Sequence, residues 1–173
     1  NFQLQDIIRY VSQYQSAVEP KGLQAIKVES QTGYSVVASK ASRYLSKEAA
    51  AEQVFASWFS LHSLWDKIRT TGGAYGASCW VDNGEKSIIY SSYRDPSPEK
   101  TIKVYADALK DVMDNPIPKD DIDKTIVSTY GGAIVPVTPK DRGERGFNAF
   151  IYGEPDYSRQ RRVDNILNVT PED

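Results

Sequence analysis

The stretch from Cys79 to Tyr90 constrains the fold more than any other part of this chain. Two runs rich in β-branched and aromatic residues flank Asn83-Gly84. Asn-Gly supplies the positive φ angles that a two-residue hairpin turn needs. The pattern therefore predicts a β-hairpin over residues 76 to 93, which gives the fold an antiparallel pair of strands.

Two further strands are predicted upstream of the hairpin. They are Ala25 to Glu29 and Tyr34 to Ala38, which flank a plausible turn at Gln31-Thr32-Gly33.

A long helix is predicted between these strands and the hairpin. Ser46 can cap its N-terminus, and Gly72 and Gly73 are expected to end it. Its buried face is expected to be one continuous apolar stripe: Val54, Trp58, Leu61, Trp65 and Ile68.

Helical spacing of apolar residues also predicts the remaining elements. After the hairpin, Ser97 and Pro98 open a helix that ends at Asn115-Pro116. Other helices are expected over residues 2 to 18, over residues 120 to 130 up to Gly131-Gly132, and near residues 140 to 152 and 156 to 167.

The order of these elements favours an α+β fold, a two-layer sandwich of a largely antiparallel sheet with helices packed on one face. With 173 residues, 40% of them apolar, the chain can bury a core without disulfides or metals. Residues 1 to 20 are expected to form a helical segment linked to a missing upstream part, and residues 21 to 173 the domain. The final Thr170-Pro171-Glu172-Asp173 is typical of a helix start, so truncation at the C-terminus is expected.

Composition argues against several classes of partner. A net charge of −2 and a pI near 5.5 give no electrostatic footprint for nucleic acid or an anionic membrane. No apolar run is long enough to span a bilayer. The one basic cluster, Arg159, Arg161 and Arg162, is interpreted as a solvated helix face rather than a binding patch.

The usual metal and nucleophile sites cannot be assembled from this sequence. It holds one His and one Cys, whereas a catalytic zinc normally takes three protein ligands. His62 falls inside the long helix, where a packed or partly exposed residue is expected rather than a ligand. Cys79 falls inside a strand, where a small buried hydrophobe is expected. The glycine-rich residues 72 to 76 join a helix to a strand, the reverse of the order in phosphate loops.

Arg69 and Tyr75 are the first candidate site, because a glycine turn separates them and can bring their side chains together. A permanent cation and a phenol O–H suit a carbonyl oxygen that becomes negative during attack on a peptide bond. In the alternative interpretation, Arg69 only satisfies the last carbonyls of its helix and Tyr75 only packs.

Tyr93-Arg94-Asp95-Pro96 is the second candidate. Asp95 can pair with Arg94 or turn the chain ahead of Ser97. A structural role is favoured over contact with a substrate.

Two of these motifs also carry a resemblance to a known family. The relevant residues are Leu64-Trp65-Asp66-Lys67-Ile68-Arg69, Gly72-Gly73-Ala74-Tyr75-Gly76, Ser92-Tyr93-Arg94-Asp95-Pro96 and Lys100-Thr101. In order and separation they resemble the last domain of the presequence proteases, a branch of the insulinase (pitrilysin) superfamily of zinc peptidases. The resemblance runs from about residue 34 to the end of the chain.

The resemblance implies a C-terminal substrate-binding half of a zinc endopeptidase that degrades unfolded peptides. It implies that the zinc ligands lie in the absent N-terminal half of the protein, and that this half is the binding partner of the present chain. It also implies that this fragment alone binds no metal and is inactive. It gives Arg69 and Tyr75 the catalytic role at the scissile carbonyl. The substrate-binding residues that it implies are Gly72, Gly73, Ala74, Tyr93 and Arg94. A bacterial cytoplasm or an organelle matrix is the favoured compartment.

Two other functions stay open. One is a non-catalytic relative that survives as a structural or peptide-holding module. The other is a free-standing domain that binds an extended peptide along the exposed edge of its hairpin.

Overall fold

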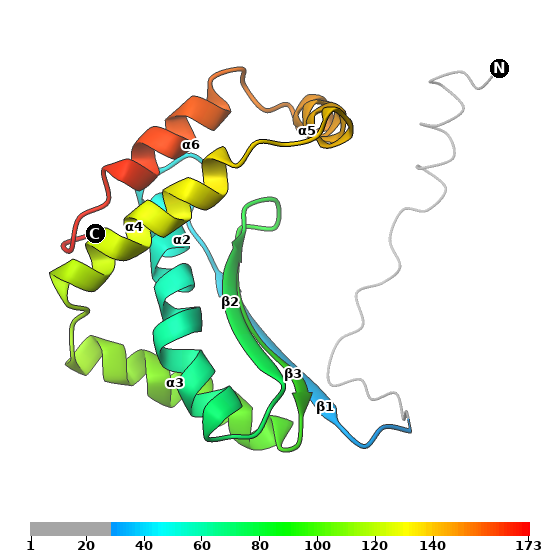
Figure 1. Ribbon diagram of the computed structural model, residues 1–173, viewed down its shortest axis with the longest axis vertical. Helices are drawn as coiled ribbons and strands as arrows, with labels where there is room; N and C mark the ends of the chain where they lie inside the picture. Colours follow the sequence, from blue (N-terminus) through cyan, green and yellow to red (C-terminus); the bar gives the residue numbers. More distant parts are fainter. Residues whose placement is uncertain (1–28) are drawn as a thin grey trace. The chain divides into compact units, whose positions relative to one another are not determined.

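The computed structural model describes residues 29–173, of which Gln31–Asp173 form one compact unit (Figure 1). Helix α2 continues directly into η1, a stretch of π-helix. The elements in order are β1 (Gly33–Lys40), α2 (Lys47–Phe59), η1 (Ser60–Thr70), β2 (Gly76–Asp82), β3 (Ser87–Asp95), α3 (Pro98–Asp114), α4 (Lys119–Ile134), α5 (Pro139–Ile151) and α6 (Ser158–Leu167).

The strands of the described residues form one antiparallel sheet in the order β1-β3-β2. The hairpin prediction is confirmed, with Trp80 opposite Ile89, and so is the strand predicted from Tyr34. β1 pairs with β3, and the register shifts where Tyr34 of β1 lies opposite both Tyr93 and Arg94, so that β3 bulges there. β1 and β2 are therefore the two edges of the sheet.

The predicted two-residue hairpin turn is wrong. Asp82 and Ser87 form the last strand pair, so residues 83 to 86 all lie in the loop. The Asp82 carboxylate accepts hydrogen bonds from the N–H groups of Gly84 (2.9 Å) and Glu85 (3.0 Å). The one left-handed residue of the loop is Lys86, with φ 50°. The side chain of Asp82 thus supports a wider loop than Asn-Gly alone would favour.

The helix formed by α2 and η1 begins where it was predicted, but part of its predicted buried face is exposed. The Ser46 hydroxyl accepts a hydrogen bond from the Ala49 N–H at 3.1 Å, which confirms the N-cap. In η1, however, Leu61 and Trp65 are 61% and 42% exposed, whereas Leu64 and Ile68 are buried. Each backbone hydrogen bond of a π-helix spans five residues instead of four, so positions spaced for an α-helical stripe shift around the helix. Leu61 and Trp65 of the predicted stripe therefore face outward, while Ile68 stays buried.

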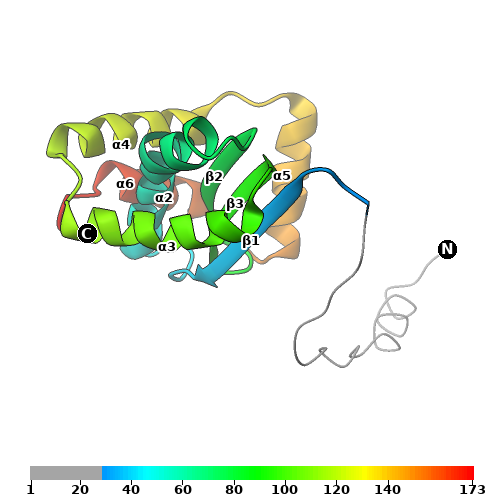
Figure 2. The ribbon, with the colours of Figure 1, turned by 90° about the horizontal axis from the view of Figure 1, so that it is seen from below.

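The predicted α+β sandwich is confirmed. α2, η1 and α3 pack on the same side of the sheet (Figures 1 and 2). The main core lies between these layers and includes Phe59, Leu64, Ile68, Tyr90 and Tyr105. α4 and α6 pack against α2 and against each other, around a second cluster that contains Val54, Ile126 and Ile166.

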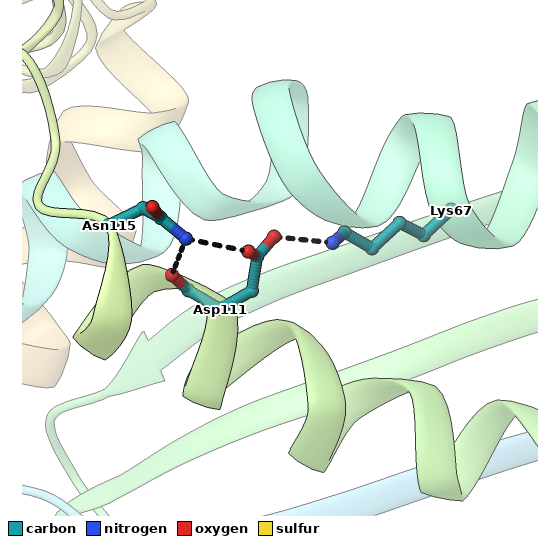
Figure 3. A network of polar contacts seen from close by, with 3 residues as sticks. All are labelled: Lys67, Asp111 and Asn115. Carbon is teal, nitrogen blue, oxygen red and sulfur yellow. Dashed lines mark hydrogen bonds and ion pairs between the residues drawn. The ribbon is translucent and has the colours of Figure 1, made fainter.

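A polar network ties η1 to the C-terminal end of α3 (Figure 3). The Lys67 ammonium lies 2.7 Å from one carboxylate oxygen of Asp111, and the Asn115 amide donates to the other at 3.1 Å. The hydrogen bond and charge of Lys67 hold the pKa of Asp111 below its ordinary value. This contact fixes the helix that carries Arg69 against α3.

The other helix predictions hold with one correction. Helices α3, α5 and α6 lie where they were predicted, but α4 runs through Gly131-Gly132 to Ile134 instead of ending there. Neither of those glycines has a positive φ, so nothing in their backbone breaks the helix. The helix predicted over residues 2 to 18 and residues 25 to 28 of the first predicted strand lie outside the described residues. The division at residue 20 and the C-terminal truncation stay predictions.

Candidate functional site

The turn from η1 into β2 has a well-defined geometry. The Gly73 N–H donates to the Arg69 carbonyl and the Ala74 N–H to the Ile68 carbonyl, each at 3.1 Å. Gly73 has φ 78°, and a Cβ on Gly72 would lie 2.6 Å from the Ile68 carbonyl oxygen. Both positions therefore require glycine. The prediction that these glycines end the helix is confirmed.

Tyr75 follows this turn and joins it to the end of β3. Its N–H donates to the Tyr93 carbonyl at 3.1 Å, which continues the β2 and β3 pairing by one residue. Its side chain is 65% exposed. The side chain of Tyr75 is thus exposed, while its backbone is held by the glycine turn on one side and by β3 on the other.

Three exposed tyrosines and one arginine form a continuous surface here, which we call the tyrosine surface: Tyr34, Tyr75, Tyr93 and Arg94. The Tyr93 ring packs edge-on against Tyr34 (centroids 5.4 Å apart) and Tyr75 (5.7 Å). The Arg94 guanidinium carbon lies 5.4 Å from the Tyr93 centroid and 5.8 Å from that of Tyr75. Flat rings beside a guanidinium suit the backbone and side chains of an extended peptide.

Arg69 lies on the other side of the glycine turn with a different partner. Its guanidinium carbon is 3.9 Å from the centroid of the Trp65 ring, a close cation–π contact. The structure therefore brings Tyr75 together with Tyr93 and Arg94, while Arg69 rests on Trp65. Arg69 is partly exposed, so its charge is open to a ligand above that ring.

Asp95 turns the chain beneath the tyrosine surface. It is 1% exposed, and its two carboxylate oxygens accept from the Ser92 hydroxyl and the Ser97 N–H, each at 2.7 Å. Burial raises the pKa of Asp95, but the hydrogen bonds from Thr101, Ser92 and Ser97 outweigh it, so the pKa lies below its ordinary value. Of its two predicted roles, turning the chain ahead of Ser97 is therefore the one found. Ser97 is the N-cap residue of α3, as predicted, although its side chain makes no capping hydrogen bond.

Two further residues complete this buried network, and sequence reasoning missed both. The Ser35 hydroxyl lies 2.7 Å from that of Ser92 and 2.9 Å from the Tyr105 hydroxyl. Burial raises the pKa of Tyr105. The only signal in the sequence is a serine on the inward side of each of two paired strands, which is too common a pattern to single them out.

The described residues offer no candidate metal site. Among residues 29–173 no three His, Cys, Asp or Glu side chains are grouped so that they could hold a metal ion. His62 stacks on Trp58, with ring centroids 5.5 Å apart. Cys79 is buried, and burial raises the pKa of its thiol to about 12, so it stays protonated and unreactive. Cys79 is therefore a buried strand residue, as predicted, while His62 is an exposed helix residue that stacks on Trp58.

Two solved structures share this fold. A conserved protein from Enterococcus faecalis superposes with a TM-score of 0.66 at 18% identity, over 84% of this chain and 36% of that one. The inactive peptidase domain of a candidate zinc protease from Bordetella parapertussis gives 0.65 at 11% identity, over 85% of each chain. At these identities the likeness concerns the α+β fold alone.

The family is shown by sequence: the chain belongs to the family described as the PreP C-terminal domain, whose profile matches residues 33–173. It is 32% identical over 143 residues to the mitochondrial presequence protease of Candida albicans. It is 31% identical over 110 residues to presequence protease 1, chloroplastic/mitochondrial, of Arabidopsis thaliana. The matched regions are 83% and 64% of this chain.

This chain corresponds to a small part of those relatives. The matched region spans 14% of the Candida albicans protein and 10% of the Arabidopsis thaliana protein. The chain is thus homologous to a C-terminal portion of presequence proteases. No helix among residues 29–173 is long and apolar enough to cross a membrane.

Proposed function

We propose that this chain is the C-terminal substrate-binding part of a zinc-dependent endopeptidase that degrades unfolded peptides. Arg69 and Tyr75 would act on the carbonyl of the bond being cleaved, and Gly72, Gly73, Ala74, Tyr93 and Arg94 would line the path of the peptide. The observation that carries the proposal is the exposed phenol of Tyr75, held on a rigid backbone at the edge of an open tyrosine surface.

Exposure separates the proposed catalytic role of Tyr75 from a packing role. A tyrosine that only packs buries its ring and pairs its O–H, as Tyr105 does with Ser35. The Tyr75 ring instead touches Tyr93 and leaves its O–H outside the fold. A side chain in this position can meet a group supplied from outside this domain, which supports a site completed between two halves of a longer protein.

Two donors around one carbonyl oxygen give a definite chemical role. When a nucleophile attacks a peptide carbonyl, the oxygen becomes negative, and donors already in place stabilise it. Tyr75 supplies a neutral O–H and Arg69 a permanent cation with five N–H donors. Arg69 lies on the Trp65 ring, and both donors have to meet the same oxygen when a substrate is bound. Loss of one such donor typically costs roughly 3 to 4 kcal/mol of barrier.

The described residues do not fit a zinc site, because they contain no suitable group of ligands. The zinc of such a peptidase would be held in the N-terminal half of the protein. Bound zinc supplies Lewis-acid chemistry and an activated water in enzymes of this kind. The residues of this chain would act only on the substrate.

The test uses the longer protein that contains this chain. Its zinc content and its cleavage of an unstructured peptide are measured beside Tyr75→Phe and, as a matched control, Tyr34→Phe, which removes a phenol O–H from the same surface. We expect a zinc-loaded protein, a fall of roughly a hundredfold or more in turnover for Tyr75→Phe with zinc retained, and less than a twofold change for Tyr34→Phe. Equal effects of the two variants would contradict the role of Tyr75.

The same assay separates the non-catalytic alternative. A longer protein that holds no zinc and cleaves no peptide, but still binds one, would be a peptide-holding relative.

The third possibility is strand addition along the hairpin edge, and β2 is an edge strand of the sheet. Measurable affinity of this chain alone for extended peptides would support it, and no binding would leave it without support.

A further inference from the structure

Four arginines from two helices line one cleft, far from the tyrosine surface in the sequence. Arg142 and Arg145 come from α5, and Arg159 and Arg162 from α6. The cleft has a volume of about 690 Å³ and is also lined by the end of α4. Each pair is spaced i, i+3, which places both members on one side of their helix. The fold thus joins two arginine pairs that are separate in the sequence.

The positive charge of the cleft is not balanced by ion pairs. The ion pairs among residues 29–173 all use lysines: Lys67 with Asp111, Lys119 with Asp123, Lys124 with Asp121, and Lys140 with Glu144. Two carboxylates, Glu154 and Asp156, line the cleft with the four arginines. The cleft therefore carries a net positive charge within a chain whose net charge is −2.

The partners already present leave the arginines available. Glu154 accepts hydrogen bonds from the hydroxyls of Tyr44 (3.4 Å) and Ser158 (3.2 Å) rather than from a guanidinium. Arg162 donates one Nε–H to Gln53 at 3.2 Å, which leaves the outer N–H groups of its guanidinium free for a ligand. Arg145 and Arg159 are exposed at the rim.

Small apolar side chains also line the cleft and indicate what kind of anion fits. Ala133 lies at the end of α4 and Val137 after it, Ala149 belongs to α5 and Val163 to α6, while Tyr44, Asn148 and Ser158 add polar groups. A bare phosphate would use the guanidinium groups but not this apolar wall. A ligand that carries carboxylates and apolar side chains together would use both.

We infer that this cleft binds a short acidic segment of polypeptide. The planar guanidinium fork matches a carboxylate in two parallel hydrogen bonds, so the arginine pairs hold Asp or Glu side chains while apolar side chains pack on the wall. The volume lies within the usual range of binding pockets, roughly 300 to 1,000 Å³. Sequence alone indicated a solvated face for Arg159, Arg161 and Arg162. The structure places Arg159 and Arg162 in the lining of the cleft and leaves Arg161 outside it.

Arg161 provides a matched control for the test, because it lies on the same helix. The probe is a fluorescein-labelled peptide in which glutamate and leucine alternate, and its anisotropy is followed as the 173-residue chain is added. We expect Arg145→Gln and Arg159→Gln each to weaken binding by roughly tenfold, and Arg161→Gln by less than about twofold. A peptide in which lysine and leucine alternate should not bind.

Three results would overturn the inference. One is equal binding of the acidic and basic peptides, and another is equal loss in Arg161→Gln and Arg159→Gln. The third is pyrophosphate that binds as tightly as the acidic peptide and displaces it, because the site would then recognise phosphate and ignore the apolar wall. Circular dichroism of each variant checks that the fold is kept. The inference requires no catalysis, so it stands or fails separately from the proposed peptidase role.

Discussion

The segment from Ser92 to Asp95 has two sides with opposite properties. Ser92 and Asp95 are buried and fully hydrogen-bonded, and they hold β3, β1 and the start of α3 together. Tyr93 and Arg94, which lie between them in the sequence, have exposed side chains that make ring contacts. The comparison shows that one short motif divides its residues between fixing the backbone and presenting side chains outward.

The largest effect on stability is expected from the buried side. Asp95→Ala leaves the Ser92 hydroxyl and the Ser97 N–H without their acceptor inside the protein. The free energy of unfolding should fall by about 2 to 4 kcal/mol, measured by urea denaturation. Asp107→Ala on the exposed side of α3 is the control and should change it by less than about 0.5 kcal/mol. Similar losses in both variants would contradict the role of the Asp95 network.

The glycine turn gives the next largest effect. Gly72→Ala places a Cβ against the Ile68 carbonyl oxygen, which is backbone and cannot move aside alone. We expect a loss of about 1 to 3 kcal/mol in the free energy of unfolding. Gly76→Ala, whose Cβ would meet nothing within 4 Å, should change it by less than about 1 kcal/mol. If the two substitutions are equally tolerated in thermal denaturation, the turn is not as rigid as described.

A smaller effect is expected in the dependence of stability on pH. The pKa of Asp95 is lower in the folded chain than its ordinary value, so the unfolded chain takes up the proton first as pH falls. The stability that this carboxylate contributes is therefore complete above an ordinary Asp pKa of about 3.9 and is lost as pH falls through the lower folded pKa. Asp95→Asn should flatten the acid side of a plot of unfolding free energy against pH. An unchanged slope would show that Asp95 does not titrate in this way.

The smallest effect on the free energy of unfolding is expected from the exposed side of this segment. Here the substitution should raise stability instead of lowering it. Arg94 has φ 47°, a left-handed conformation that costs a residue with a Cβ about 1 kcal/mol or more. Arg94→Gly should therefore raise the free energy of unfolding by about 0.5 kcal/mol, after the lost ring contacts are subtracted. The same variant should weaken peptide binding by the longer protein. Lower stability with unchanged binding would place Arg94 with the structural residues instead.

Much of this fold could be predicted from the sequence because its signals are local. Capping by Ser46, Pro98 at a helix start and the glycine turn all act within a few residues, and each is found where it was predicted. The buried face of η1 was not predictable, because a change to π-helical winding has no clear local signature and moves Leu61 and Trp65 outward.

The candidate site was likewise predictable from the sequence only where its signals are local. The glycine turn and the motif around Arg94 could be recognised as short patterns, and the structure joins them through the hydrogen bond from Tyr75 to Tyr93. The contact of Arg69 with Trp65 depends on where a flexible side chain rests, which no sequence pattern specifies. The buried link from Ser35 to Tyr105 joins residues 70 positions apart, so it exists only in the folded chain.

The most direct test of the central claim is a double-mutant cycle in the longer protein that contains this chain. Turnover of an unstructured peptide is measured for Arg69→Gln, Tyr75→Phe and the two substitutions together. If both side chains bind the same developing oxyanion, the double variant should lose little more than the worse single variant, because either loss already disrupts the shared site. Losses that multiply independently, or no loss from Tyr75→Phe, would contradict a joint role for Arg69 and Tyr75.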